Sequence, residues 1–226
     1  MLYCLIYWLG ENYMVTRAEL KSRAKFLLRQ DEEHFWKSNR FWKMFAICLI
    51  VSLILGASEF IKSEYDMNLQ NLVVQVFIYP LISLGVTTAC KRLYEVNQVE
   101  VSDMFSTFSD FKNYKVIVIT ILYGLLIIVG TMLFIVPGII WSLMYSQVYN
   151  IFADDNSLGI FECMKKSRLL MRGHKFELLV LGLSFIPWGL LVVVTFGIAG
   201  IYVVPYTTVT YYCYFAELRR ESEMQE

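Results

Sequence analysis

The sequence predicts an all-α fold: a polytopic membrane bundle of six transmembrane helices, arranged as three hairpins, with short amphipathic helices on the cytosolic side. Residues 116–153 contain no Asp, Glu, Lys, Arg or His, and residues 178–216 form a second charge-free run. The composition is 57 % hydrophobic and 18 % charged, whereas soluble domains contain roughly 25 % charged residues. The basic residues are confined to a few segments between the apolar runs. These observations together favour an integral membrane protein.

Each charge-free run is long enough for a helical hairpin. About 20 helical residues cross the roughly 30 Å hydrocarbon core of a bilayer. One straight helix over residues 116–153 would measure about 57 Å at 1.5 Å per residue. We therefore expect spans at 116–132 and 133–153 from the first run, and at 177–195 and 198–216 from the second.

Two further apolar blocks predict the first hairpin. Residues 44–58 are charge-free, and with an interfacial collar at Phe41, Trp42 and Lys43 they predict a span at 41–59. Residues 69–90 predict the second span. The predicted organisation is a single membrane domain at 16–218, a cytosolic tail at 219–226, and an extension at 1–15 that is either interfacial or the result of a misassigned start, with Met14 as the true initiator.

The turns of the second and third hairpins each have two candidate positions. In the second hairpin we favour a turn near Gly130 over one at Pro137-Gly138, because Pro137 then lies in the outer half of span four as a kink. The third hairpin offers Gly197 or Gly200 as its turn. The candidate helix hinges are Pro80, Pro137, Gly138 and Pro205; structural kinks are the simpler interpretation of these residues.

The basic residues predict the orientation. Nineteen of the 20 Lys and Arg residues lie at 17–43, 91–115, 154–177 and in the tail, and Lys62 is the exception. Six spans place all four segments on one side of the membrane. The positive-inside rule makes that side the cytosol, so we expect both the N-terminal and the C-terminal segment to be cytosolic.

The cytosolic segments predict three short helices. The first has a capping box at 16–19, and its Leu20, Ala24, Leu27, Leu28 and Phe35 share one face. We expect Ser102-Asp103 to cap the second helix, and Asp155, Asn156 or Ser157 to cap the third. On the third helix Ile160, Met164, Ser167 and Met171 share a face. The candidate contacts to anionic lipid headgroups are Lys165, Lys166, Arg168, Arg172 and Lys175.

Several classes of function are disfavoured. No ionisable side chain lies deep in a predicted span, which argues against an ion-coupled carrier. No Ser/His/Asp, HExxH, P-loop or paired-carboxylate motif occurs, so we expect no enzyme; one would need polar groups converging near Arg168, Arg172 and His174. Five scattered cysteines and two histidines predict buried free thiols, no metal and no cofactor. The zero net charge argues against a nucleic-acid partner.

Neutral polar residues do occur within the predicted spans. Gln75, Gln147 and Asn150 are candidates for the interior of the bundle. Such groups usually form hydrogen bonds between helices. The alternative is a polar cavity through which a small solute passes.

Several segments resemble one bacterial family. They are TRAELKSRAK at 16–25, FIVPGII at 134–140 with Tyr145-Ser146, SRLLMRGHK at 167–175, LSFIPWGLL at 183–191, Phe196-Gly-Ile and Pro205-Tyr206. Over residues 16–218 the chain resembles the integral-membrane family known as domain of unknown function 975; Pro187 stands where that family more often has Gly. The resemblance implies a multi-span protein, chiefly of Firmicutes and related bacteria, and brings no known substrate or catalytic residue. A more distant similarity is to the membrane halves of some glycerophosphodiester phosphodiesterases.

We therefore expect a non-enzymatic, multi-pass protein of the bacterial cytoplasmic membrane. Its role would be structural, regulatory or protective, with membrane lipids and another membrane protein as the expected partners. The alternative is a small transporter or channel subunit for a neutral or lipid-like substrate. The sequence leaves the oligomeric state open.

Overall fold

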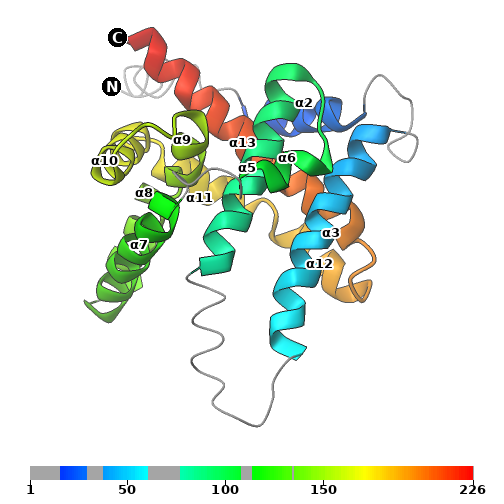
Figure 1. The fold of residues 1–226 in the computed structure, drawn as a ribbon, viewed down its shortest axis with the longest axis horizontal. Helices are drawn as coiled ribbons and strands as arrows, with labels where there is room; N and C mark the ends of the chain where they lie inside the picture. The colour runs from blue at the N-terminus through cyan, green and yellow to red at the C-terminus, as the bar shows by residue number, and fades with distance from the viewer. Residues whose placement is uncertain (1–15, 30–37, 61–76, 108–113, 134, 226) are drawn as a thin grey trace, which may run out of the picture.

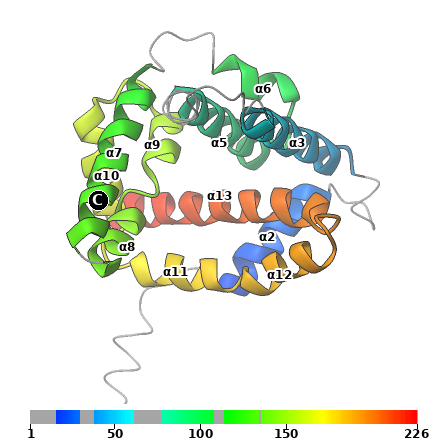
Figure 2. The same ribbon diagram turned by 90° about the horizontal axis from the view of Figure 1, so that it is seen from below.

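The structure is a computed structural model that describes residues 16–29, 38–60, 77–107, 114–133 and 135–225, and these ranges are all-α (Figure 1). Figure 2 shows α13 (Gly200–Gln225) crossing the middle of the molecule. Helices α3 and α5 lie along one side of it and α11 and α12 along the other, while α7 to α10 gather at its C-terminal end. The largest fully buried side chains include Tyr206, Tyr214 and Phe215 of α13, so the core is built around this helix.

The first hairpin contains α3 (Asn39–Phe60) and α5 (Tyr79–Val96). The predicted span at 41–59 is helical. The second predicted span is described only from residue 77, and its helix continues six residues beyond Cys90; Gln75 and the connection between the helices lie outside the described residues. Pro80 is buried in the first turn of α5, directly after a π-helical turn at 77–78. A proline is tolerated there because the first N–H groups of a helix have no partner within it.

The second hairpin contains α7 (Tyr114–Leu133) and α8 (Ile135–Met144). The favoured turn near Gly130 is wrong, because α7 continues through this residue. Gly130 instead faces the next helix: a Cβ atom on it would lie 3.2 Å from Gly138 Cα. Pro137 lies in the first turn of α8, where a proline is tolerated because the first N–H groups of a helix have no partner within it. The two glycines therefore allow the helices to approach closely, as small residues do in membrane proteins.

Two of the predicted long spans are interrupted. Span four becomes α8 and α9 (Val148–Asp154), separated by a turn at 145–147. Span five becomes α11 (Lys175–Leu183) and α12 (Ile186–Val194). Pro187 occupies the first turn of α12, and a proline disfavours helical geometry in the residue before it and removes one helical hydrogen bond. This accounts for the second interruption.

The third hairpin turns at Gly197, one of its two candidate positions. Gly197 has a φ of 90° and Phe196 a φ of 51°. The N–H of Gly197 donates to Val192 O at 2.8 Å and that of Phe196 to Val193 O at 3.1 Å, which is the Schellman pattern of a helix end. Gly200 begins α13, which continues unbroken through Pro205 and into the predicted tail as far as Gln225.

The amphipathic helices are present, with two corrected starts. In α2 (Arg17–Arg29) the predicted apolar residues are buried, except Phe35, which lies outside the described residues. Helix α6 (Val101–Ser106) has Glu100 as its N-cap, and Asp103 accepts a hydrogen bond from the Glu100 N–H at 2.9 Å. Helix α10 (Ile160–Leu170) has Gly159 as its N-cap. The predicted caps at Ser102-Asp103 and at 155–157 are therefore wrong. Asp103 instead accepts a hydrogen bond from the Glu100 N–H, and Glu162 accepts one from the Gly159 N–H.

Two helical segments are long and apolar enough to cross a membrane. They are Tyr114–Met132, which is most of α7, and Lys175–Val194, which combines α11 and α12. Only 17 % of each segment is buried inside the protein. A core helix of a soluble domain is mostly buried, whereas most of each of these two segments is not buried inside the protein.

Candidate functional site

The predicted lipid-contact residues divide between two separate hollows beside α10. Lys165 and Arg168 line a groove between α10 and the α7–α8 hairpin. Lys166 and Arg172 line a smaller hollow against α13. Lys175 is the first residue of α11 and lines neither. The structure therefore separates cations that the sequence presents as a single group.

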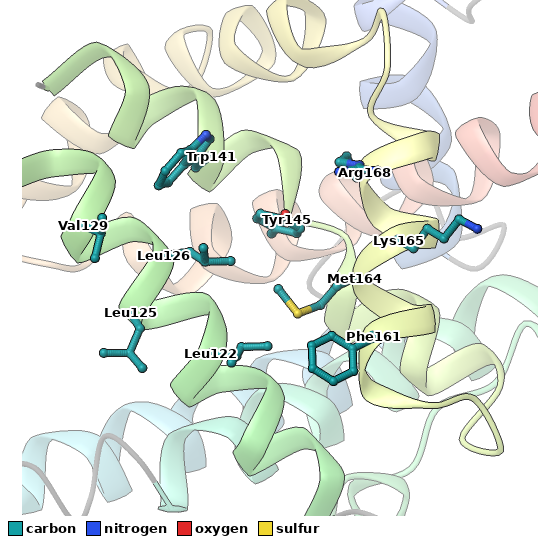
Figure 3. Close-up of a pocket in the computed structure, with 10 residues that line it drawn as sticks. All are labelled: Leu122, Leu125, Leu126, Val129, Trp141, Tyr145, Phe161, Met164, Lys165 and Arg168. Carbon is teal, nitrogen blue, oxygen red and sulfur yellow. The ribbon is translucent and has the colours of Figure 1, made fainter. Parts of the chain in front are cut away.

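The groove has a volume of about 590 Å³ and is mostly apolar (Figure 3). Figure 3 shows the aliphatic side chains of α7 along one wall and α10 opposite, with Arg168 on the same side of the groove as Met164. The Lys165 ammonium points away from the groove, on the side of α10 opposite to Phe161 and Met164. The apolar lining residues are Leu122, Leu125, Leu126, Val129, Trp141, Tyr145, Phe161 and Met164.

The smaller hollow has a volume of about 200 Å³ and brings His174 and Glu221 beside Lys166 and Arg172. Arg168 lines the groove and not this hollow. The three groups that an enzyme would need, namely Arg168, Arg172 and His174, therefore do not converge on one hollow. The expectation that the protein is not an enzyme stays a prediction.

His174 links the start of α11 to α13. Its Nδ1 lies 3.1 Å from Glu177 Oε2, and its Nε2 lies 4.0 Å from Glu221 Oε2. The hydrogen bond with Glu177 raises the pKa of His174 above its ordinary value of 6.5. The Tyr214 hydroxyl donates to the His174 carbonyl oxygen at 3.0 Å. The corner between α10 and α11 is thus attached to α13 by both the backbone and the side chain of His174.

Gln147 and Asn150 lie together at the interruption between α8 and α9. The Asn150 Nδ2 donates to Gln147 Oε1 at 2.8 Å, and the Gln147 Nε2 donates to Ser146 Oγ at 3.0 Å. Gln147 is only 4 % exposed. Both residues line a cavity of about 480 Å³, and Asn150 also lines a second cavity of about 500 Å³. Tyr211 of α13 lines both cavities, so Asn150 and Tyr211 stand between them.

Two acidic residues, which the sequence reasoning did not single out, link α13 to helices that are distant from it in the sequence. Glu217 is buried, accepts a hydrogen bond from Arg23 of α2 at 3.1 Å, and forms an ion pair with Arg220 at 3.0 Å. Asp154 accepts from Arg219 at 2.7 Å and pairs with Lys91 at 3.2 Å. Both acids directly follow a charge-free run, which is the signal that could have marked them.

The cysteines in the described part of the chain confirm the prediction of buried free thiols. Cys48, Cys90, Cys163 and Cys213 are free and buried. Burial raises the pKa of the Cys163 thiol to about 11, so it resists ionisation. Among the described residues, no three His, Cys, Asp or Glu side chains are placed to hold a metal ion.

The fold and these hollows define an all-α protein with two candidate membrane-spanning helical segments and amphipathic helices beside them. A family model described as protein of unknown function (DUF975) matches residues 126–222. The match confirms the family resemblance over the C-terminal part of the chain, which includes α8 to α12 and most of α13. No curated protein and no solved structure matches this chain.

Proposed function

We propose that this chain is a non-enzymatic integral protein of the bacterial cytoplasmic membrane, with a structural, regulatory or protective role exerted through contacts with lipids or with another membrane protein. In this proposal the chain crosses the bilayer six times as three hairpins. Its N-terminal and C-terminal segments lie in the cytosol. The observation that carries the proposal is that the long apolar helices turn most of their surface outward.

This apolar surface is large. Met132 at the end of α7 is 85 % exposed, Val193 and Val194 of α12 are 74 % and 73 % exposed, and Phe196 at the hairpin turn is 98 % exposed. Each Å² of apolar surface left in water costs about 25 cal/mol. Lipid tails remove this cost, so a bilayer is the environment that this surface suits.

The arrangement of the helices supports the proposed orientation. Figure 1 shows α2, α9 and α10 toward one end of the molecule, and the C-terminal end of α7 and the α12–α13 turn toward the other. The Lys and Arg residues are concentrated in α2, α10 and their neighbouring segments. A basic end next to the cytosol is what the positive-inside rule expects.

One observation favours a second candidate function, a small transporter or channel subunit for a neutral or lipid-like substrate. The two cavities that Asn150 and Tyr211 separate lie between helices and have polar groups in their lining. If they belong to a path, Asn150→Leu should abolish uptake of small neutral solutes into proteoliposomes, with Asn156→Leu, outside the cavities, as the control. Equal uptake by the wild type, both variants and empty liposomes would remove this candidate.

The leading proposal is tested by extracting the protein directly into native nanodiscs and identifying the lipids and proteins that accompany it. We expect the protein to resist alkaline carbonate extraction and to retain a reproducible set of lipids or a partner protein. Recovery as a lone monomer with the lipid composition of the bulk membrane would contradict the proposed role. Release by carbonate would contradict membrane residence itself.

A further inference from the structure

The groove between the α7–α8 hairpin and α10 combines two chemistries that are seldom adjacent. Its volume of about 590 Å³ falls within the roughly 300–1,000 Å³ of small-molecule sites. Its walls are aliphatic and aromatic, and among the described residues that line it only Lys165 and Arg168 are charged. A ligand that matches this lining is itself amphipathic, with an apolar part and an anionic group.

The apolar walls open to the surroundings of the protein. Leu125 on α7 is 54 % exposed and Phe161 on α10 is 76 % exposed. Phe161 lies on the same short helix as the cations, one turn before Lys165 (Figure 3). An apolar surface of this kind, continuous with the exposed face of a candidate membrane helix, suits an acyl chain and would be costly to leave in water.

The two cations have no acidic partner within the described part of the chain. No described carboxylate oxygen lies within 4 Å of either side chain, whereas Arg219 has Asp154 at 2.7 Å. Lys165 and Arg168 are three positions apart on α10, which places them on neighbouring sites of one helix face. Arginine and lysine beside each other suit a phosphate, which the guanidinium binds through two donors and the ammonium as a point charge.

We propose that this groove binds an anionic phospholipid, with one acyl chain between α7 and α10 and the phosphate group against Arg168, toward which the exposed Lys165 side chain can turn by a change of rotamer. The inference rests on the proposed membrane residence and adds a specific ligand and place to it. A soluble anion would leave the apolar walls exposed, and a neutral lipid would leave the two cations unpaired. Only the anionic lipid satisfies both parts of the lining.

The test compares phosphatidylglycerol with phosphatidylcholine of the same acyl chains, added to detergent-solubilised protein and counted as retained molecules by native mass spectrometry. Wild type should retain phosphatidylglycerol preferentially. Lys165→Gln with Arg168→Gln should weaken that retention about thirty-fold, since each cation contributes on the order of 1 kcal/mol, or about fivefold. Leu126→Trp, which fills the groove, should weaken retention of both lipids.

The matched control removes the same charge from the smaller hollow, which shares no lining residue with the groove. Lys166→Gln with Arg172→Gln should retain phosphatidylglycerol as wild type does. Equal losses in the two double variants would show a general effect of surface charge and overturn the proposal. So would full competition by soluble glycerol phosphate, which would indicate a headgroup-only anion site. Every variant should still resist carbonate extraction, so loss of lipid selectivity with membrane residence intact would count against this inference alone.

Discussion

The close approach of α7 and α8 makes Gly138 the most informative position to change. A Cβ atom on Gly138 would lie 3.1 Å from both the N and the Cα of Thr131, and 2.5 Å from its Oγ1. The hydroxyl can rotate away, but the backbone atoms of α7 cannot. Gly124 on the same helix is a matched control, because a Cβ atom there would have no neighbour within 4 Å.

The structure gives the size of the effect. Carbon atoms pack at about 3.5–4.0 Å, so Gly138→Ala requires the two helices to separate by roughly 0.4–0.9 Å. Overpacking of this kind costs about 1–3 kcal/mol. At Gly124 the same substitution meets open space, and it should be neutral or stabilising by up to about 1 kcal/mol, since alanine has less backbone entropy to lose in a helix.

Thermal unfolding of the purified variants, followed by circular dichroism, measures the difference. About 2–4 °C of Tm corresponds to each kcal/mol in a chain of this size. We expect Gly138→Ala to lower Tm by at least that amount and Gly124→Ala to leave it unchanged or raised. If the two variants unfolded at the same temperature, the reasoning about the α7–α8 contact would be refuted.

Two further predictions concern the ionic contacts of Glu217 and Glu177. Glu217→Gln should cost about 1–2 kcal/mol, because it removes a buried carboxylate from the partly exposed Arg23; trypsin should then cleave α2 faster, while Glu223→Gln should leave the digestion rate unchanged. The raised pKa of His174 means that its contact with Glu177 stabilises the fold fully below pH 6.5 and less as pH rises through the raised pKa. Tm should therefore fall with pH above this value, and Glu177→Gln should flatten the profile; an identical profile in the variant would contradict the assignment.

Much of the helical content could be predicted from charge and hydropathy alone. The charge-free runs located the helices because unbroken apolar sequence of that length has few other stable forms. The face of α2 followed from the spacing of Leu20, Ala24, Leu27 and Leu28, which recur at helical intervals. All four are buried.

The interruptions of predicted spans four and five were harder to predict from the sequence, for two different reasons. The break before α12 had a visible signal in Pro187, whose ring and missing N–H limit the preceding turn. The break at 145–147 had no such signal. There the Ser167 hydroxyl of α10 donates to the Met144 carbonyl oxygen at 3.0 Å, so a tertiary contact occupies an acceptor at the end of α8. Sequence spacing cannot reveal a partner 23 residues away.

The candidate sites depended even more on three-dimensional placement. The sequence marked Lys165, Lys166, Arg168, Arg172 and Lys175 as one basic set, because all five lie within eleven consecutive residues. The division of the first four between a groove and a separate hollow depends on which helices pack against α10. The role of Glu217 could not be predicted from the sequence, because its partner, Arg23 of α2, lies at the other end of the chain.

The central claim, that the chain crosses a membrane as hairpins with its basic end in the cytosol, is tested most directly by cysteine labelling. In a cysteine-free background, Ile198→Cys places a thiol at the α12–α13 turn, where the side chain is 72 % exposed, and Lys165→Cys places one on the exposed face of α10. A membrane-impermeant maleimide should label Ile198→Cys in intact spheroplasts, and Lys165→Cys only after the membrane is permeabilised. Labelling of Lys165→Cys in intact spheroplasts, or of both positions only after permeabilisation, would contradict the account.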